Sequence, residues 1–439
     1  MVDGGQGRRP VGTLRALRYR NYRLFFSGQL ISLIGTWMQS VAQSWLVYRL
    51  TGSAALLGLI GFSSQLPVFV LATLGGAVAD RGQRRNILLC TQCASMVLAL
   101  LLAVMTLAGW IQVWHIFLLS SLLGCVNAFD IPARQAFVVE MVGRDDLVNA
   151  IALNSSIFNG ARIIGPAIAG TLVATIGEGW CFFLNAVSYL AVIANLNAMQ
   201  ISSRPRTPRA ASVPATIVEG FRYVWQNRPI RLLLVLLGLV SFMGMPYVVL
   251  MPIFADQILH HGARGLGLLI GATGVGAIAG ALVLAARPGI AGLGRWIVCG
   301  AAGFGLSLVL FSLSRSFWLS LVLLLPSGFC QTVQMASSNT LIQSMVPDAI
   351  RGRVMALYSM MFMGMAPFGA LFAGLLAHYI GAPAVVMLGG IICIAGALVF
   401  GWRLYRLRGQ VRRMISSHAD NQLHQDGKNS LGSRRISSL

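Results

Sequence analysis

The sequence predicts an all-α membrane protein with twelve transmembrane helices in two related six-helix halves. Hydrophobic residues make up 56% of the 439 residues and charged residues only 10%, whereas about a quarter of a typical soluble protein is charged. The apolar runs match the length of about 20 residues that crosses a bilayer as a helix. A shift of 204 residues aligns Gly124 with Gly328 and Gly165 with Gly369, which indicates a fold made of two copies of one unit.

The apolar runs set the expected spans and the expected domains. We expect spans at residues 25–48, 54–79, 86–108, 113–138, 150–176, 180–199, 231–254, 265–286, 296–313, 317–344, 354–380 and 383–402. The domains expected from them are a first bundle with a basic N-terminal tail over 1–199, a cytoplasmic linker over 200–230, a second bundle over 231–403 and a basic, disordered tail over 404–439. The first span is expected to stay uncleaved, since no signal-peptide pattern precedes it.

The linker is expected to carry a short amphipathic helix. Its apolar residues Ile217, Phe221, Val224 and Trp225 fall on one helical face, with basic and polar residues elsewhere. This pattern is typical of a helix that lies on the membrane surface.

The placement of the basic residues predicts the orientation of the chain. The net charge is +21, and with the N-terminus inside only Arg49, Arg264 and Arg315 fall on outer segments. Arg134 and Arg162 fall within spans, and every other basic residue lies on the inner side. This asymmetry places both termini in the cytoplasm. It also indicates contact with anionic lipid headgroups rather than with nucleic acid.

A charged loop between the second and third spans resembles a signature of the major facilitator superfamily. The sequence GAVADRGQRR, residues 76–85, is similar to the family pattern GxxxDRxGRR, from which Gly82 and Gln83 depart. The resemblance implies a role in locking and unlocking the cytoplasmic gate for Gly76, Asp80, Arg81, Arg84 and Arg85. The alternative is a headgroup anchor and topology signal, because basic residues in short loops serve that purpose in many membrane proteins.

Three charged residues fall inside the fourth and fifth spans: Asp130, Arg134 and Arg162. If the chain folds back near Asp146, Asp130 and Arg162 lie at similar depths, each roughly 24 Å along its helix, and could pair. Arg134, one helical turn from Asp130, is the other possible partner. Charges within a span are costly and are functional candidates by default. We therefore expect a coupling site. The alternative is a structural ion-pair network, because buried pairs are often structural.

The fifth span also resembles the antiporter signature of the same superfamily, GxxxGPxxGG. Residues 161–170 read ARIIGPAIAG, so Gly165, Pro166 and Gly170 match the signature, while Ala161 and Ala169 stand where the family has glycine. The signature is associated with exporters. Small residues at these positions also let helices approach closely.

Polar and soft side chains within the spans are candidates for lining a substrate cavity between the halves. They are Trp37, Gln39, Gln43, Asn127, Asn159, Gln331, Gln334 and Met335. The alternative is that the polar members form hydrogen bonds between helices, as polar side chains in membranes commonly do.

Longer phrases, such as residues 35–58 and 129–170, resemble the transmembrane secretion effector branch, a group similar to enterobactin exporters and macrolide efflux proteins. The resemblance implies a monomer in a bacterial inner membrane that exports a drug, a siderophore or another amphipathic metabolite by proton antiport. The sequence holds no P-loop pattern and no metal or catalytic pattern, so we expect an ion gradient as the energy source, no cofactor and no enzymatic activity. A lipid or lysolipid flippase and a non-transporting membrane sensor are the alternatives.

Overall fold

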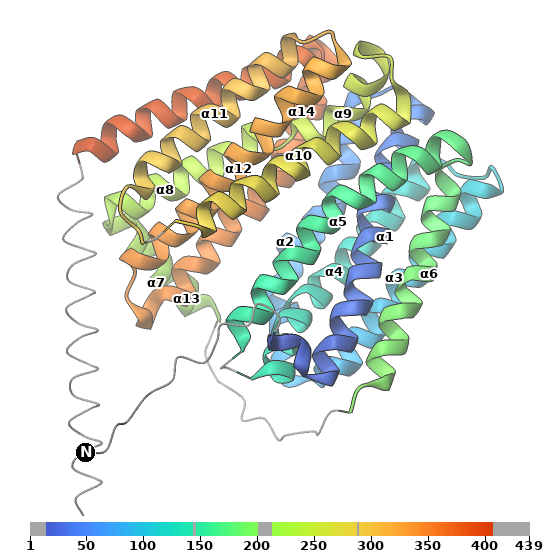
Figure 1. The fold of residues 1–439 in the computed structure, drawn as a ribbon, viewed down its shortest axis with the longest axis horizontal. Coiled ribbons are helices and arrows are strands. Elements are labelled where there is room, and N and C mark those ends of the chain that lie inside the picture. The colour runs from blue at the N-terminus through green and yellow to red at the C-terminus, as the bar shows by residue number, and fades with distance from the viewer. Residues whose placement is uncertain (1–14, 144–145, 201–212, 288, 407–439) are drawn as a thin grey trace, which may run out of the picture.

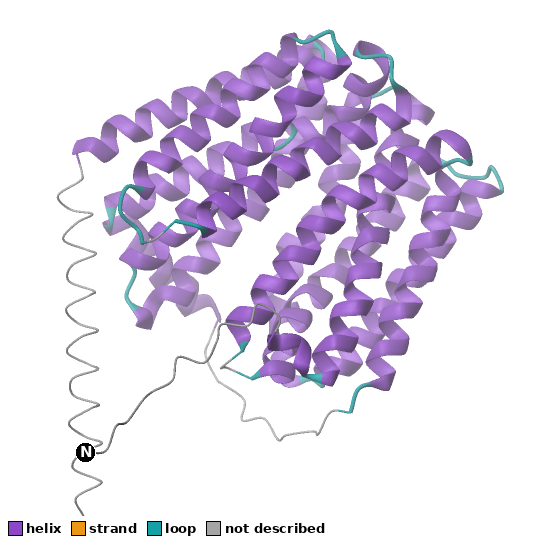
Figure 2. Ribbon diagram, viewed as in Figure 1, coloured by secondary structure: helices purple, strands orange, loops and turns teal. Residues whose placement is uncertain are grey.

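The computed structural model describes residues 15–143, 146–200, 213–287 and 289–406, which form helices joined by short turns (Figures 1 and 2). The first half contains η1 (Arg15–Arg18), α1 (Arg20–Thr51), α2 (Ala54–Arg81), α3 (Arg84–Leu107), α4 (Val113–Val142), α5 (Leu147–Thr175) and α6 (Glu178–Ala198). The linker helix is α7 (Val213–Gln226). The second half contains α8 (Arg228–Leu239), η2 (Val240–Gly244), α9 (Tyr247–Ile253), η3 (Phe254–Ile258), α10 (Gly262–Ala285), α11 (Leu293–Leu313), α12 (Phe317–Met345), α13 (Asp348–Ser359), η4 (Met360–Gly364), α14 (Met365–Ile380) and a last helix, Ala382–Arg406.

The twelve expected spans are confirmed. Among the described residues, 11 helices are long and apolar enough to cross a membrane. The remaining span is α1, which has 32 residues but is more polar, since it carries Gln29, Gln39 and Gln43. Two spans are built from several helical pieces, at 228–258 and 350–380, because the chain passes through π-helical turns there.

The repeat found in the sequence corresponds to equivalent packing in the two halves. A Cβ on Gly124 of α4 would lie 2.5 Å from the backbone oxygen of Ser64 in α2. Its counterpart Gly328, in α12, packs in the same way against the backbone of Thr273 in α10. Because glycine has no Cβ, these helix pairs approach more closely than larger residues would allow.

The halves contact each other through a second pair of equivalent glycines. Gly170 of α5 packs on α10, where an added Cβ would lie 2.9 Å from the Ala263 oxygen. Gly374 of α14 packs on α2, where an added Cβ would lie 2.6 Å from the Ala54 oxygen. Gly170 and Gly374 are also 204 residues apart, so the two contacts between the halves are related by the repeat.

These contacts lie toward one end of the bundle. We call the end at which α6 ends and α8 begins the linker end, and the other end, where α1 meets α2, the opposite end. The named contacts between α5 and α10 and between α2 and α14 lie in the part of each helix nearer the opposite end. In Figure 1 the two halves lie side by side there and diverge toward the linker end, where α7 and α13 lie.

The linker helix is fixed to the second half. Glu219 of α7 forms an ion pair with Arg353 of α13, and Gly220 packs against the Arg353 backbone. Phe221 and Trp225 stack on each other, with ring centroids 5.8 Å apart, and remain 56% and 62% exposed. This exposed aromatic pair fits a helix that meets the membrane surface.

Parts of the expected domain organisation lie outside the described residues. These parts are residues 1–14 of the N-terminal tail, residues 201–212 of the linker, the side chain of Ile217 and residues 407–439 of the C-terminal tail. The domain boundaries therefore stay predictions.

The N-terminal segment η1 is fastened to the start of α5. Asp146, whose side chain is buried, accepts hydrogen bonds from Arg18 at 2.7 Å and from the Tyr19 hydroxyl at 2.9 Å. The hydrogen bond with Tyr19 and the charge of Asp146 raise the pKa of Arg18. The arginine is thus kept charged at the linker end.

Candidate functional site

Asp130 lies at the centre of a buried polar network. Asp130 is only 1% exposed. It forms an ion pair with Arg134, one helical turn further along α4. The Thr91 hydroxyl and the Gln92 amide, both on α3, donate hydrogen bonds of 2.9 Å to Asp130 Oδ1. Arg134 in turn donates to Gln29 Oε1 of α1 at 3.0 Å. Both carboxylate oxygens of Asp130 are therefore satisfied.

The network lies inside the first half rather than between the halves. It joins α1, α3 and α4. Within the described part of the chain, Asp130 has an ion pair only with Arg134. The expected pairing with Arg162 is therefore absent from this structure. The Arg162 guanidinium lies over the Trp37 ring instead.

Arg162 lies at the seam between the halves, by which we mean the interface where α5 packs on α10 and α2 packs on α14. Its Cζ lies 5.8 Å from the centroid of the Trp37 ring, and Trp37 contacts Phe158 edge-on at 5.6 Å. On the other side, a Cβ on Gly274 of α10 would lie 3.5 Å from the Arg162 backbone oxygen. The charge of Arg162 acts on the hydroxyl of Tyr247 in the second half.

Gln39 and Gln43 form hydrogen bonds between helices of the first half. Gln39 is buried and accepts a 2.7 Å hydrogen bond from Asn185 of α6. Gln43 donates to the Ser120 hydroxyl of α4 at 2.9 Å. Of the two readings of this polar stripe, the structure favours helix–helix hydrogen bonding at these positions.

The other cavity candidates differ in their surroundings. Asn127 is half-buried on α4, and Asn159 donates to the Ser155 carbonyl of its own helix at 2.8 Å. Gln334 is buried and its amide faces Ser338 at 3.5 Å.

Two further candidates lie on α12 and contact neighbouring helices. Gln331 is buried against Met245 of the seventh span. The Met335 carbonyl accepts a 3.0 Å hydrogen bond from the Tyr358 hydroxyl of α13.

The charged loop between α2 and α3 is anchored by two of its arginines. Arg84 donates a hydrogen bond of 2.8 Å to Glu140 and one of 2.9 Å to the Ala136 carbonyl, both on α4. Arg85 donates 2.9 Å to the Leu196 carbonyl near the end of α6, where it complements the negative end of the helix dipole. These contacts hold the first half together at the linker end.

The remaining loop residues are more open. Asp80 and Arg81 are exposed, and among the described residues Asp80 forms no ion pair. Nothing lies within 4 Å of a Cβ built on Gly76. The linker-end part of α2, which the family signature would press against the eleventh span, is therefore exposed among the described residues.

The segment that resembles the antiporter signature, residues 161–170, lies where α1, α5 and α10 meet. A Cβ on Gly165 would lie 2.6 Å from Trp37 Cβ and 2.9 Å from the Ile34 oxygen, so this glycine brings α5 against α1. Pro166 and Gly170 instead pack on Gly267 of α10. The motif thus joins the first half internally and also contacts the second half.

One polar contact between the halves was not foreseen from the sequence. The Tyr48 hydroxyl, at the end of α1, donates a 2.8 Å hydrogen bond to Asp256 Oδ2 in η3. Its neighbour Arg49 is paired at 2.7 Å with Glu178 at the start of α6. In the sequence, Asp256 stands out only as an acidic residue two positions beyond the expected seventh span. Its partner Tyr48 is 208 residues away, so no local pattern predicts the hydrogen bond.

Comparison with known proteins identifies the family of this chain. The sequence pattern described as "Transmembrane secretion effector" matches residues 11–430, nearly the whole chain. The chain belongs to the transmembrane secretion effector family. This family is a branch of the major facilitator superfamily, in agreement with the all-helical fold and its two repeated halves.

Several curated members of the transmembrane secretion effector family and its superfamily are similar over most of their length. The staphyloferrin A transporter of Staphylococcus aureus is 25% identical over 86% of this chain and 95% of its own. The multidrug efflux pump Tap of Mycolicibacterium fortuitum is 26% identical over 80% and 88%. The enterobactin exporter EntS of Shigella boydii is 27% identical over 77% and 80%. This chain is thus a membrane transporter of the family that moves small molecules.

A solved structure shares the fold. A bacterial homologue of the human lysosomal transporter Spinster, in an inward-facing and occupied conformation, superposes with a TM-score of 0.68 over 88% of this chain and 97% of that chain. Its sequence identity of 13% makes this a likeness of fold alone.

Proposed function

We propose that this protein is a secondary active transporter that exports an amphipathic small molecule, such as a drug, a siderophore or a similar metabolite, by proton antiport and alternating access. The substrate class is supported by the names of the relatives, which include siderophore transporters and a multidrug efflux pump. The protein resides in a bacterial inner membrane as a monomer. Its termini and linker end face the cytoplasm.

The observation that carries this proposal is the arrangement of contacts between the halves. Gly170 with α10 and Gly374 with α2 form two equivalent contacts near the opposite end, supported by the Tyr48–Asp256 hydrogen bond. Helices that meet through glycines have little side-chain interdigitation at those points, and the further contacts between α2 and α14 include those of Phe368 with Phe62 and Phe69. The described conformation is then the one open to the cytoplasm, and rocking would open the other side.

Asp130 is the proposed coupling group. Of the acidic residues in the described part of the chain, it lies deepest within a span; Asp80, Glu140, Glu178 and Asp256 lie at span ends. The guanidinium of Arg134 and the hydrogen-bond donors on α3 occupy both carboxylate oxygens of Asp130 here. Proton uptake therefore requires α4 to move relative to α3 or the ion pair to open during the transport cycle.

The test is substrate-driven proton movement in everted vesicles, with dyes, macrolides and catechol siderophores as a panel. Antiport predicts uptake that a protonophore abolishes and a substrate-induced loss of the pH gradient. Asp130→Asn, alone and together with Arg134→Gln, should uncouple substrate transport from proton movement. Glu178→Gln is the matched control, since Glu178 is also paired with an arginine but at a span end. Uptake that ignores the protonophore and persists in the Asp130 variants would contradict proton antiport.

A further inference from the structure

Buried polar atoms without partners gather where the two halves meet. Arg162 Nε, Tyr247 Oη and Ser327 Oγ are each buried and form no hydrogen bond with any described residue. Arg162 comes from α5 in the first half, whereas Tyr247 and Ser327 come from α9 and α12 in the second. Leaving such a group unpaired costs about 1–3 kcal/mol, so three of them in one region call for a physical explanation.

The packing of α10 brings the three groups into one region. Gly328, the neighbour of Ser327, packs against the backbone of Thr273 in α10, one residue from the Gly274 that packs on Arg162, and the Tyr247 hydroxyl lies within the electrostatic reach of Arg162, Thr273 and Ser327. None of these neighbours forms a well-directed hydrogen bond to the phenol oxygen. The backbone places Arg162 at the seam, because Gly274 of α10 packs against α5 at this residue.

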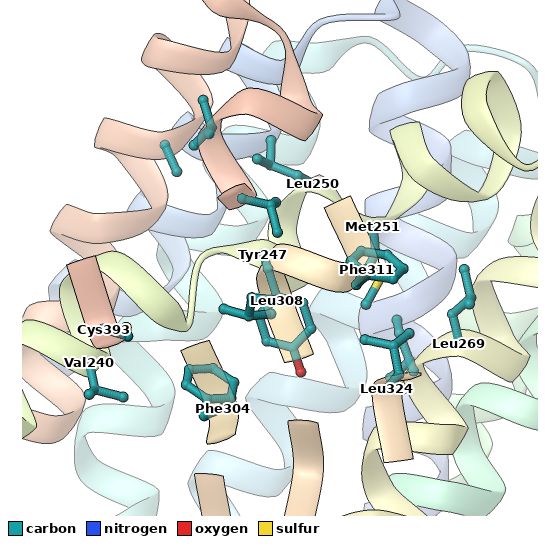
Figure 3. Packing of buried hydrophobic residues seen from close by; sticks show 14 of the residues in the cluster. Val240, Tyr247, Leu250, Met251, Leu269, Phe304, Leu308, Phe311, Leu324 and Cys393 are labelled. Atoms are coloured by element: carbon teal, nitrogen blue, oxygen red, sulfur yellow. The ribbon is translucent and has the colours of Figure 1, made fainter. Parts of the chain in front are cut away.

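Apolar and aromatic side chains surround these donors. The Arg162 guanidinium lies over Trp37, which contacts Phe158. The Tyr247 ring contacts Phe304 edge-on, with centroids 6.0 Å apart. In the view of Figure 3, the ring lies among Leu308, Phe304 and Phe311, and its hydroxyl oxygen points away from Leu250 and Met251. Packing of this kind holds the phenol in one orientation.

The chemistry of the cluster defines its ligand. A guanidinium and two hydroxyls are hydrogen-bond donors, and only the guanidinium carries a charge. Among the described residues no carboxylate pairs with Arg162, since Asp130 is paired with Arg134. Donors of this kind in apolar surroundings match an oxygen that carries negative charge, and such hydrogen bonds are stronger than neutral ones.

We propose that Arg162, Tyr247 and Ser327 bind an anionic oxygen of the substrate, a carboxylate or a phenolate, while the apolar part of the substrate stacks on Trp37. This inference rests on the proposed function and narrows its substrate class to amphipathic anions. Because the guanidinium belongs to one half and the hydroxyls to the other, rocking of the halves changes the distance between them. Binding would then be tight in one conformation and weak in the other.

The test compares two probes that share the pyrene ring and the chain length and differ at the polar end: 1-pyrenebutyrate carries an anionic carboxylate and 1-pyrenebutanol a neutral hydroxyl. The full chain is placed in phosphatidylcholine nanodiscs, which contain no net anionic lipid to compete for the site. Energy transfer from tryptophan to pyrene reports binding, since Trp37 lines the cluster. The variants are Arg162→Gln, Arg162→Lys, Tyr247→Phe and Ser327→Ala, with Arg264→Gln, an exposed arginine of α10, as the control.

The wild type and Arg264→Gln should bind the butyrate about tenfold or more tightly than the alcohol. Arg162→Gln should abolish this preference, Arg162→Lys should retain part of it, and each hydroxyl deletion should reduce it several-fold. Equal affinity for the two probes in the wild type, or a preference that survives Arg162→Gln, would overturn the site. Binding is read without transport, so a protein that shows the preference but moves no protons would refute antiport and leave the site standing.

Discussion

Replacing Asp130 with asparagine should destabilise the first half strongly unless Arg134 is neutralised with it. The carboxylate is 1% exposed and forms an ion pair with a guanidinium whose side chain is only 27% exposed. Removing one partner of such a buried pair leaves an uncompensated charge and costs about 3–5 kcal/mol. Asparagine keeps an oxygen that can accept from Thr91 and Gln92, so the loss should lie near the lower figure.

The double variant Asp130→Leu with Arg134→Met should recover most of that loss. Exchanging a buried ion pair for apolar residues of similar size is often neutral or stabilising. The double variant should therefore be about 3 kcal/mol more stable than the Asp130→Asn single variant. Alanine at Asp130 should be worse than asparagine, because it also leaves the Gln92 amide without an acceptor, while the Thr91 hydroxyl can still donate to the Leu88 carbonyl at 3.0 Å.

The assay is thermal unfolding in detergent, followed by tryptophan fluorescence. For a unit of this size, 1 kcal/mol corresponds to about 2–4 °C, so Asp130→Asn should lower the midpoint by about 6–12 °C. A midpoint within about 2 °C of the wild type would refute the claim that the pair is buried and mutually dependent. A double variant as unstable as the single one would refute it as well.

Three further predictions follow from contacts between or beside the halves. Gly267→Ala should force α5 and α10 apart, because its Cβ would overlap the Pro166 oxygen and lie 3.0 Å from Gly170 Cα, and should abolish transport. Gly271→Ala is the control, since the atom nearest to its Cβ, the Ile163 oxygen, would be 3.8 Å away. Equal activity of the two variants would count against the contact. Tyr48→Phe removes a hydrogen bond to a carboxylate, worth about 1.5–3 kcal/mol, and should raise thiol labelling of a cysteine placed at Ala54, which is buried at this end, by roughly tenfold or more. Unchanged labelling would show that this hydrogen bond does not hold the opposite end closed. Arg353→Gln breaks the ion pair that holds α7 to α13 and should speed proteolysis within 213–226, whereas Arg222→Gln should not, and equal rates would speak against the attachment.

The spans were predictable because a bilayer imposes a length on every helix. The expected spans 113–138 and 150–176 compare with α4 at Val113–Val142 and α5 at Leu147–Thr175. The glycines of the repeat were also predictable, since a position that needs close backbone approach in one half needs it in the other. Gly124 and Gly328 illustrate this, as each meets the backbone of the neighbouring span.

The partners of individual side chains were not predictable in the same way. A sequence gives depth along a helix but not its rotation against its neighbours. It therefore left both Arg134 and Arg162 open as partners of Asp130, and the structure shows an ion pair with Arg134. Gln39 and Gln43 share a helix face, yet only the structure shows that this face meets α4 and α6. Tyr48 and Asp256 lie 208 residues apart, and no local pattern joins them.

The central claim is that transport requires the halves to separate at the opposite end, and a reversible cross-link tests it most directly. A Cβ on Gly61 of α2 would lie 3.5 Å from Ala370 Cβ of α14, within the range for a disulfide. Gly61→Cys with Ala370→Cys, in a protein whose seven native cysteines are replaced, should lose transport on oxidation and regain it on reduction, while Gly61→Cys alone should be insensitive. Full transport by the completely cross-linked protein would contradict the account.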